Sequence, residues 1–251
     1  ALPISALQLR PHQIQVVIYH SPCPDGFLAA TILLSALPAS VIYIGTDHRS
    51  LTRVLYHYRD YYCLLVDIAP TVSDLALLQP ERFVVLDHHE SSRETFAQLT
   101  PAQGIYEPKR SGCGLAWQYV YAKWCMPYLV AAVEARDLWQ QRTVPHCEPF
   151  LAGAHALCGW CPYCWLELCR PQYWQYVYER GYHIYQEQLQ IIQIYTSDAK
   201  PYYKNNVRVW GVEVPFIRCI SQVGFALVSM HPARYERSEE HTSELQSQST
   251  I

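Results

Sequence analysis

One carboxylate and two imidazoles stand side by side at Asp87, His88 and His89, directly after the apolar run of residues 83–86. Such a run is typical of a short strand buried inside a parallel sheet. In open α/β sheets, ligands bind beyond the carboxyl ends of the strands. Carboxylate and imidazole donors together suit a divalent transition metal. Whether this strand end is a metal site depends on whether other strands end in the same way.

Other expected strands do end in residues of the same kind. One apolar, β-rich segment stops at His20, with Asp25 in the turn that follows, and another stops at Asp67. Asp137 comes just after the apolar face of an expected helix. A pair of metal ions needs carboxylates that can bridge and ligands from several elements, since one strand cannot surround two ions. The spacing therefore predicts a binuclear site at the carboxyl edge of a sheet.

The elements that would position these residues alternate between strand and helix. This alternation predicts an α/β fold with a doubly wound, mainly parallel sheet. The expected strands cover residues 14–19, 41–44, 62–66, 83–86 and 104–106. The expected helices cover residues 27–37, 51–58, 71–78, 115–124 and 127–136.

Beyond residue 143 the character of the sequence changes. Pro, Cys and Trp are dense in residues 144–171 and the helical pattern weakens, whereas residues 182–195 have the spacing of a long amphipathic helix. Residues 207–212 alternate as a strand, and residues 214–230 continue a small α/β unit. We therefore expect a first domain, a helical linker, an incomplete second α/β domain and a tail. Their bounds are 1–143, 144–199, 200–236 and 237–251.

Composition narrows the choice of function. Half of the 251 residues are apolar, so the chain can bury a sizeable core, and the net charge of −3 argues against a surface that coats nucleic acid. We expect the ten cysteines to be mostly reduced and the protein to be cytoplasmic. Residues 27–46 carry no charge, but Pro38 interrupts them, so we expect no membrane span. The tail resembles a translated sequencing adapter, and we expect it to be an artefact.

Four segments together resemble the motifs of the DHH phosphoesterase superfamily. They are residues 20–30, 64–67, 86–90 and 134–139, and residues 110–117 resemble a segment of its exopolyphosphatase-like and oligoribonuclease-like members. The resemblance implies Mn²⁺- or Mg²⁺-dependent hydrolysis of phosphodiester or phosphoanhydride bonds, with two ions. It also implies a smaller, DHHA1-like substrate domain after a helical linker. The expected partner is a small phosphorylated substrate or a short single-stranded oligonucleotide, with no membrane; a homodimer is left open.

The resemblance also implies a role for each matching residue. His20 and Asp25 would bind metal from the first motif, Asp67 would bridge the two ions, and His88 and Asp137 would hold the second. The neighbouring carboxylate would orient a ligand, and the next imidazole would face the substrate phosphate. Basic residues and a glycine-rich turn would add phosphate contacts. The expected catalytic and substrate-binding residues are Asp87, His89, Arg110, Ser111, Gly112 and Arg136.

The chain departs from the superfamily pattern in two places. Many members have two aspartates in the first motif, whereas Pro22 or Cys23 takes the earlier position here, and a thiolate is softer than manganese prefers. The glycine-rich, histidine-containing loop that usually ends the second domain is absent before Arg237, as in a C-terminally truncated frame. Two alternatives therefore remain beside the phosphoesterase. One is an exopolyphosphatase or pyrophosphatase, and the other is a non-catalytic scaffold that keeps the fold.

Two further groups of residues carry a weaker signal. Cys158, Cys161, Cys164 and Cys169 have nearly the spacing of an iron–sulfur site and would also suit zinc, but we favour buried packing cysteines. We assign no role in the chemistry to His48, and expect it to be structural or exposed.

Overall fold

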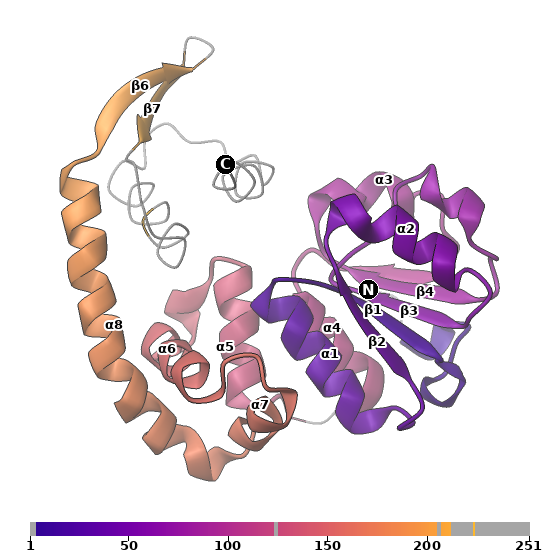
Figure 1. Ribbon diagram of the computed structural model, residues 1–251, viewed down its shortest axis with the longest axis horizontal. Helices are drawn as coiled ribbons and strands as arrows, with labels where there is room; N and C mark the ends of the chain where they lie inside the picture. The colour runs from indigo at the N-terminus through magenta and orange to yellow at the C-terminus, as the bar shows by residue number, and fades with distance from the viewer. Residues whose placement is uncertain (1–3, 123–124, 205–206, 212–222, 224–251) are drawn as a thin grey trace. The chain divides into compact units, whose positions relative to one another are not determined.

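The computed structural model describes residues 4–122, 125–204, 207–211 and 223 (Figure 1). The chain divides into two compact units, Ala1–Gly181 and Tyr182–Ile251. All predicted site residues lie in the first unit.

Five parallel strands form the centre of the first unit, in the order β2-β1-β3-β4-β5. Their bounds are Val16–His20 (β1), Ile42–Thr46 (β2), Cys63–Val66 (β3), Phe83–Asp87 (β4) and Gly104–Tyr106 (β5). The register aligns the strand ends: His20 pairs with Thr46, and Val66 pairs with Leu86. Residues that follow different strands are thus brought to one edge of the sheet, and the predicted parallel α/β fold is confirmed.

Successive side chains of the central strands enter two separate cores. Leu64 and Val66 pack in the core that contains residues of α1 (Pro24–Ala36) and α4 (Gly112–Tyr121). Leu65 packs in the other core, with residues of α2 (His48–Tyr58). Figure 1 shows α1 and α4 on one face of the sheet and α2 with α3 (Arg93–Phe96) on the other. Because both faces are covered, the strands are apolar throughout rather than alternating.

The helix expected at residues 71–78 is wrong in length. Only a 3₁₀ helix forms there, at Asp74–Leu77. Asp74 Oδ2 accepts hydrogen bonds from the amide and the hydroxyl of Thr71, and the Asp74 amide donates to that hydroxyl in turn. These local bonds compete with a longer helix, and Pro80 prevents its extension.

Residues 144–171 are more helical than their sequence pattern indicated. After α5 (Tyr128–Asp137) come α6 (Cys147–Cys158) and α7 (Pro162–Leu168), all in the first unit. The fully buried Trp165 packs edge-on against Phe27, with 5.6 Å between ring centroids. Packing against distant residues therefore stabilises these helices. The local sequence pattern of residues 144–171 cannot show this stabilisation.

Most of the described cysteines are free, in line with the expectation, but one pair in this region is not. Cys158 and Cys164 form a disulfide bond, while Cys161 is exposed and free. Cys169 is free and half-buried. None of these four belongs to a group of side chains that could hold a metal ion among the residues described.

The remaining elements include the long helix α8 (Trp174–Ser197), which covers the predicted amphipathic stretch. In the second unit, β6 (Lys200–Lys204) and β7 (Val207–Gly211) form an antiparallel hairpin. The unit predicted at residues 214–230 and the tail lie outside the described residues, apart from residue 223.

Within the part of the chain that is described, no helix is long and apolar enough to cross a membrane. Further 3₁₀ helices cover Ile4–Ala6, Pro11–Gln13, Glu90–Ser92, Gln141–Thr143 and Pro171–Tyr173.

Candidate metal centre

Three overlapping groups of side chains at the carboxyl edge of the sheet could hold metal ions. Within each group, the potential ligand atoms lie within 4.8 Å of one another. Asp67 belongs to two of the groups and so does His88, so the three form one connected centre. The groups are Asp67, Asp87, His88 and His89; His20, Cys23 and Asp67; and Asp25, His88 and Asp137. The structure thus brings together all five predicted metal ligands.

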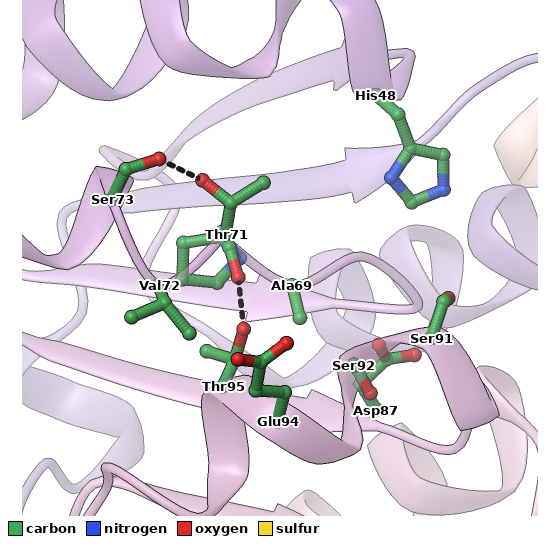
Figure 2. Close-up of a pocket in the computed structure, with 11 residues that line it drawn as sticks. His48, Ala69, Thr71, Val72, Ser73, Asp87, Ser91, Ser92, Glu94 and Thr95 are labelled. Atoms are coloured by element: carbon green, nitrogen blue, oxygen red, sulfur yellow. Dashed lines mark hydrogen bonds between the residues drawn. The ribbon is translucent and has the colours of Figure 1, made fainter.

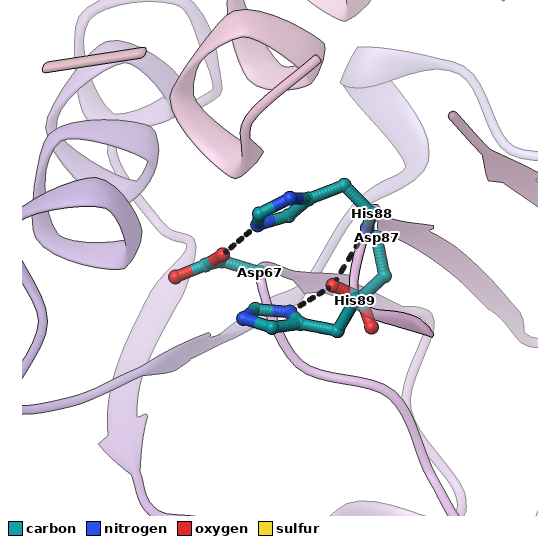
Figure 3. A group of neighbouring side chains, drawn as sticks. All are labelled: Asp67, Asp87, His88 and His89. Atoms are coloured by element: carbon teal, nitrogen blue, oxygen red, sulfur yellow. Dashed lines mark hydrogen bonds and ion pairs between the residues drawn. The ribbon is translucent and has the colours of Figure 1, made fainter. Parts of the chain in front are cut away.

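Asp67 is the centre of this arrangement. It follows β3, is fully buried and has a left-handed backbone with φ of 61°. Its Oδ1 lies 3.2 Å from His88 Nε2 (Figure 3). Its Oδ2 lies 3.6 Å from His20 Nδ1. Asp tolerates the left-handed backbone conformation better than most residues do. This conformation directs its carboxylate toward two ligand groups. Asp67 Oδ2 and His20 Nδ1 are both buried without a hydrogen-bond partner among the described residues.

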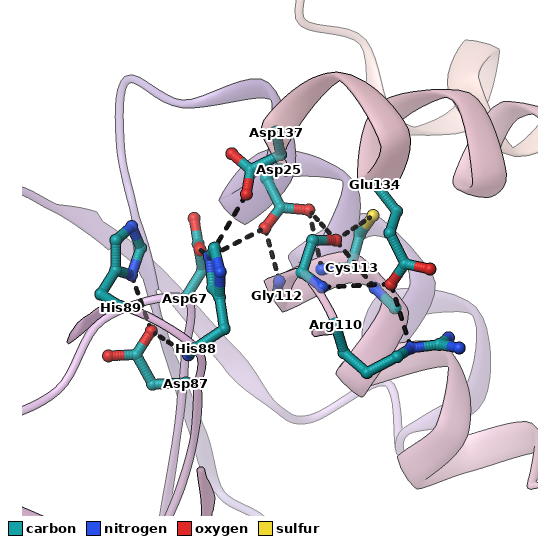
Figure 4. Close-up of polar contacts among 12 residues, drawn as sticks. Asp25, Asp67, Asp87, His88, His89, Arg110, Gly112, Cys113, Glu134 and Asp137 are labelled. Atoms are coloured by element: carbon teal, nitrogen blue, oxygen red, sulfur yellow. Dashed lines mark hydrogen bonds and ion pairs between the residues drawn. The ribbon is translucent and has the colours of Figure 1, made fainter. Parts of the chain in front are cut away.

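The N-terminus of α4 holds Asp25. Ser111 Oγ donates to Asp25 Oδ1 at 2.7 Å, and the Cys113 amide donates to the same oxygen at 2.9 Å. The Gly112 amide donates to Oδ2 at 2.5 Å (Figure 4). A Cβ atom at Gly112 would overlap Asp67 Cβ, so only glycine allows this close approach. The helix end thereby stabilises a buried carboxylate and fixes its orientation.

His88 and Asp137 complete the other side of the centre. Asp137, the last residue of α5, places Oδ2 3.4 Å from His88 Nε2, and Asp25 Oδ2 lies 3.8 Å from the same nitrogen. Asp137 Oδ2 is buried and has no hydrogen-bond partner in the described part of the chain. Two ligands about 2.1 Å from one metal ion at a tetrahedral angle would lie roughly 3.4 Å apart. The unpartnered donor atoms therefore have the chemistry and the separation that a metal ion requires.

The carboxylates of the centre repel one another. Burial raises the pKa of Asp25 well above its ordinary value, and the charges of Asp67 and Asp137 raise it further. Burial likewise raises the pKa of Asp137 to about 6. Asp67 is the exception: burial would raise its pKa, but the imidazoles of His20 and His88 hold it well below the usual range. A divalent cation bound here would relieve this repulsion.

Asp87 positions the two imidazoles that follow it. Its Oδ1 accepts the backbone amide of His88 at 2.8 Å and lies 2.8 Å from His89 Nδ1. Although burial alone would lower the pKa of His89, this bond raises it to about 10. The pKa of His88 is raised to about 9, against the effect of burial, mainly by its contact with Asp67. Without a metal ion, both rings are therefore cationic at neutral pH.

His48 is a site residue that the sequence analysis missed. Its ring centroid lies 5.1 Å from that of His20 and 6.5 Å from that of His89. With Asp87 it lines a cavity of about 600 Å³, whose wall also carries hydroxyl groups (Figure 2). These hydroxyls belong to Thr71, Ser73, Ser91, Ser92 and Thr95. His48 comes two residues after β2, so the strand-end rule that found its neighbours would have found it too.

The predicted substrate-binding residues are engaged with protein groups. Arg110 Nε lies 3.1 Å from Glu134 Oε2, which Figure 4 shows away from His88 and His89. Arg136 Nε lies 3.9 Å from Glu148 Oε1. Ser111 Oγ and the Gly112 amide donate to Asp25, and the Ser111 amide donates to Glu134 Oε2. Direct contact between these four residues and a substrate stays a prediction, whereas the contacts that hold the metal centre in place are observed.

Comparisons with known proteins give distant similarities. No family model matches the chain. The uncharacterized protein R106 of Acanthamoeba polyphaga mimivirus is 25% identical over 162 residues, an alignment that covers 55% of this chain and 36% of that protein. The crystal structure of RecJ in complex with Mn²⁺ from Thermus thermophilus has a TM-score of 0.42 and 14% identity, and the match covers 79% of this chain and 40% of RecJ. The chain spans less than half the length of either protein.

Proposed function

We propose that this chain carries the metal-binding domain of a DHH-type phosphoesterase that uses two divalent ions. The observation that carries this proposal is the fully buried Asp67, whose two oxygens face different ligand groups. Such a carboxylate can bridge two ions, and the other groups supply the terminal donors. Their oxygen and nitrogen donors suit Mn²⁺ or Mg²⁺ at most of the centre.

The chain's own residues would divide the work of phosphoester hydrolysis. The bound ions would supply a water of lowered pKa and would neutralise charge on the phosphate. His89, held in its cationic form by Asp87, is placed to donate to a phosphate oxygen next to the metal positions. The α4 N-terminus keeps Asp25 oriented as a ligand. The centre lies at the carboxyl edge of the sheet, and several of its ligand atoms have no hydrogen-bond partner among the described residues. It would therefore need little rearrangement to bind the ions.

The substrate class that fits best is a short oligoribonucleotide or a small phosphorylated nucleotide. The adjoining cavity of about 600 Å³ is lined by hydroxyls, by His48 and by the carboxylates of Asp87 and Glu94, a wall that suits hydrogen bonds to a sugar or base more than contact with a long polyanion. The formal charge of −3 also argues against an extended nucleic-acid surface. Inorganic polyphosphate and pyrophosphate would need denser basic contacts, and the described cavity wall has no Lys or Arg.

The first test measures metal binding and hydrolysis together. Calorimetric titration with Mn²⁺ should show two ions per chain, and the loaded protein should hydrolyse a generic phosphodiester. Asp67→Ala and His88→Ala should each remove hydrolysis and weaken metal binding. Asp60→Ala and His57→Ala change exposed residues of the same types and should behave as the parent.

Each outcome separates the candidate functions. Activity retained in Asp67→Ala or His88→Ala would refute the assignment of these ligands. A chain that binds no Mn²⁺ is instead the non-catalytic scaffold. Faster release of phosphate from polyphosphate or pyrophosphate than from dinucleotides would favour the exopolyphosphatase alternative.

A further inference from the structure

Cys23 occupies a metal-facing position that the proposed function does not explain. Its sulfur belongs to the same group as His20 and Asp67, with all potential ligand atoms within 4.8 Å of one another. The cysteine is free and only partly exposed. No carboxylate takes part in this group besides Asp67.

Two unpartnered atoms point to a ligand at this position. Asp67 Oδ2 and His20 Nδ1 are buried, lie 3.6 Å apart, and have no hydrogen-bond partner among the described residues. The Asp67 side chain is 1% exposed and that of His20 is 24% exposed, so the position is enclosed on one side and open to an incoming ion on the other. Apart from the ion pair with His20, Asp67 Oδ2 has no partner among the described residues, and a buried carboxylate oxygen this weakly satisfied is costly unless a cation binds it.

The place of Cys23 in the fold supports a sulfur ligand. Cys23 is the N-cap residue of α1, where the free amides and the positive end of the helix favour an anionic sulfur. On binding, the thiol would lose its proton to solvent and a metal–sulfur bond would form. A thiolate with one imidazole and one carboxylate is a donor set for a borderline metal such as zinc, whereas an all-oxygen and nitrogen set suits manganese.

We propose that Cys23, His20 and Asp67 form a thiolate-containing metal position that prefers zinc or another borderline cation. The position formed by Asp25, His88 and Asp137 has only oxygen and nitrogen donors, which suit Mn²⁺ or Mg²⁺ without a sulfur ligand to raise the affinity for zinc. The centre is then chemically asymmetric, with Asp67 between two different ions. This inference rests on the proposed function only for Asp67 as the shared ligand, and it concerns which metal each side selects.

Cobalt spectroscopy tests the sulfur ligand directly. The chain is stripped with a chelator and titrated with Co²⁺, which should produce a thiolate-to-cobalt charge-transfer band in the near ultraviolet. Cys23→Ser should lose the band and keep a cobalt ion at the Asp25, His88 and Asp137 position. Cys125→Ser, which changes an exposed free cysteine, should keep the band. X-ray absorption of the zinc form should show one sulfur at about 2.3 Å, absent in Cys23→Ser.

Competition between metals tests the selectivity. Zinc binds most nitrogen and oxygen sites more tightly than manganese, so the informative quantity is the change in the Zn²⁺/Mn²⁺ affinity ratio between variants. Cys23→Asp supplies a carboxylate and should lower this ratio by about tenfold or more. An unchanged ratio, or a charge-transfer band that survives in Cys23→Ser, overturns the proposal.

The two proposals fail in different ways. A cobalt band lost in Cys23→Ser, from a protein that hydrolyses no phosphodiester with any metal, supports the thiolate position and rejects the proposed enzyme. Hydrolysis with Mn²⁺ by a protein that shows no band supports the enzyme and rejects the thiolate position. Circular dichroism and the retained second ion show that Cys23→Ser is folded.

Discussion

At the residue scale, the charged groups of the centre are stabilised by neighbouring groups of opposite charge. Asp87 and His89 form a partly buried ion pair, with 2.8 Å between Oδ1 and Nδ1. Other charges also act on His89. The carboxylates of Asp67 and Asp137 attract its ring, and the ring of His88 repels it. The pair does not need a metal ion to form. It is therefore the part of the centre whose contribution to folding can be measured in the metal-free chain.

His89→Gln should lower the free energy of unfolding of the metal-free chain by about 2 kcal/mol at neutral pH, a value reduced for the partial exposure of the ring. The folded pKa of about 10 lies above the ordinary value of 6.5. The stabilisation is therefore complete below pH 6.5 and is lost as the pH rises through about 10. Urea denaturation in chelator at neutral pH and at about pH 10.5 measures it. The exposed His57→Gln is the control; an equal loss at both pH values would exclude the ion pair as the cause.

At the element scale, the N-terminus of α4 determines the position of Asp25. Ser111, Gly112 and Cys113 each donate a hydrogen bond to this carboxylate. Because Asp25 belongs to α1, α4 acts on the metal centre by orienting a ligand from another helix. Loss of a hydrogen bond that orients a metal ligand commonly lowers the metal affinity by about 10- to 100-fold. This arrangement gives the predicted glycine-rich turn an observed role in positioning.

Ser111→Ala should weaken Mn²⁺ binding by about 10- to 100-fold, because Asp25 loses a hydrogen bond that orients it. Ser35→Ala is a matched control, since Ser35 is a partly exposed serine on α1, the same helix as Asp25, and lies outside the centre. Calorimetric titration of both variants gives the comparison. Equal affinities in the two variants would mean that Asp25 does not depend on α4 for its role.

The elements also show which parts of the structure are readable from the sequence. All five strands were predicted, and so were the carboxylates and imidazoles at the ends of β1, β3 and β4, because an apolar run that ends in such a residue is a local signal. The left-handed backbone of Asp67, the hold of α4 on Asp25 and the helices at residues 144–171 were not, since each depends on contacts between distant segments. His48 was missed for a different reason. The same strand-end rule applied to it but was not used.

At the scale of the whole molecule, the buried carboxylates of the centre lower the stability of the metal-free fold. Asp25 is buried, Asp137 is partly buried, and both have raised pKa values, so their ionised forms oppose folding at neutral pH. A ligand that binds only the folded state adds about 2.7 kcal/mol of stability at a hundred times its dissociation constant. Metal ions should therefore change the stability of the chain more than any single side chain of the centre does.

Asp137→Asn should separate the two effects. Its folded pKa of about 6 lies above the ordinary value of 3.8, so the ionised carboxylate destabilises the metal-free fold increasingly from pH 3.8 to 6 and fully above that. In chelator the variant should be more stable than the parent by about 1 to 2 kcal/mol above pH 6, and equally stable below pH 3.8. Mn²⁺ should raise the melting temperature of the parent well above that of the variant. Asp60→Asn, at an exposed position, should respond to Mn²⁺ as the parent does; a variant that is less stable in chelator and equally stabilised by Mn²⁺ would place Asp137 outside the metal centre.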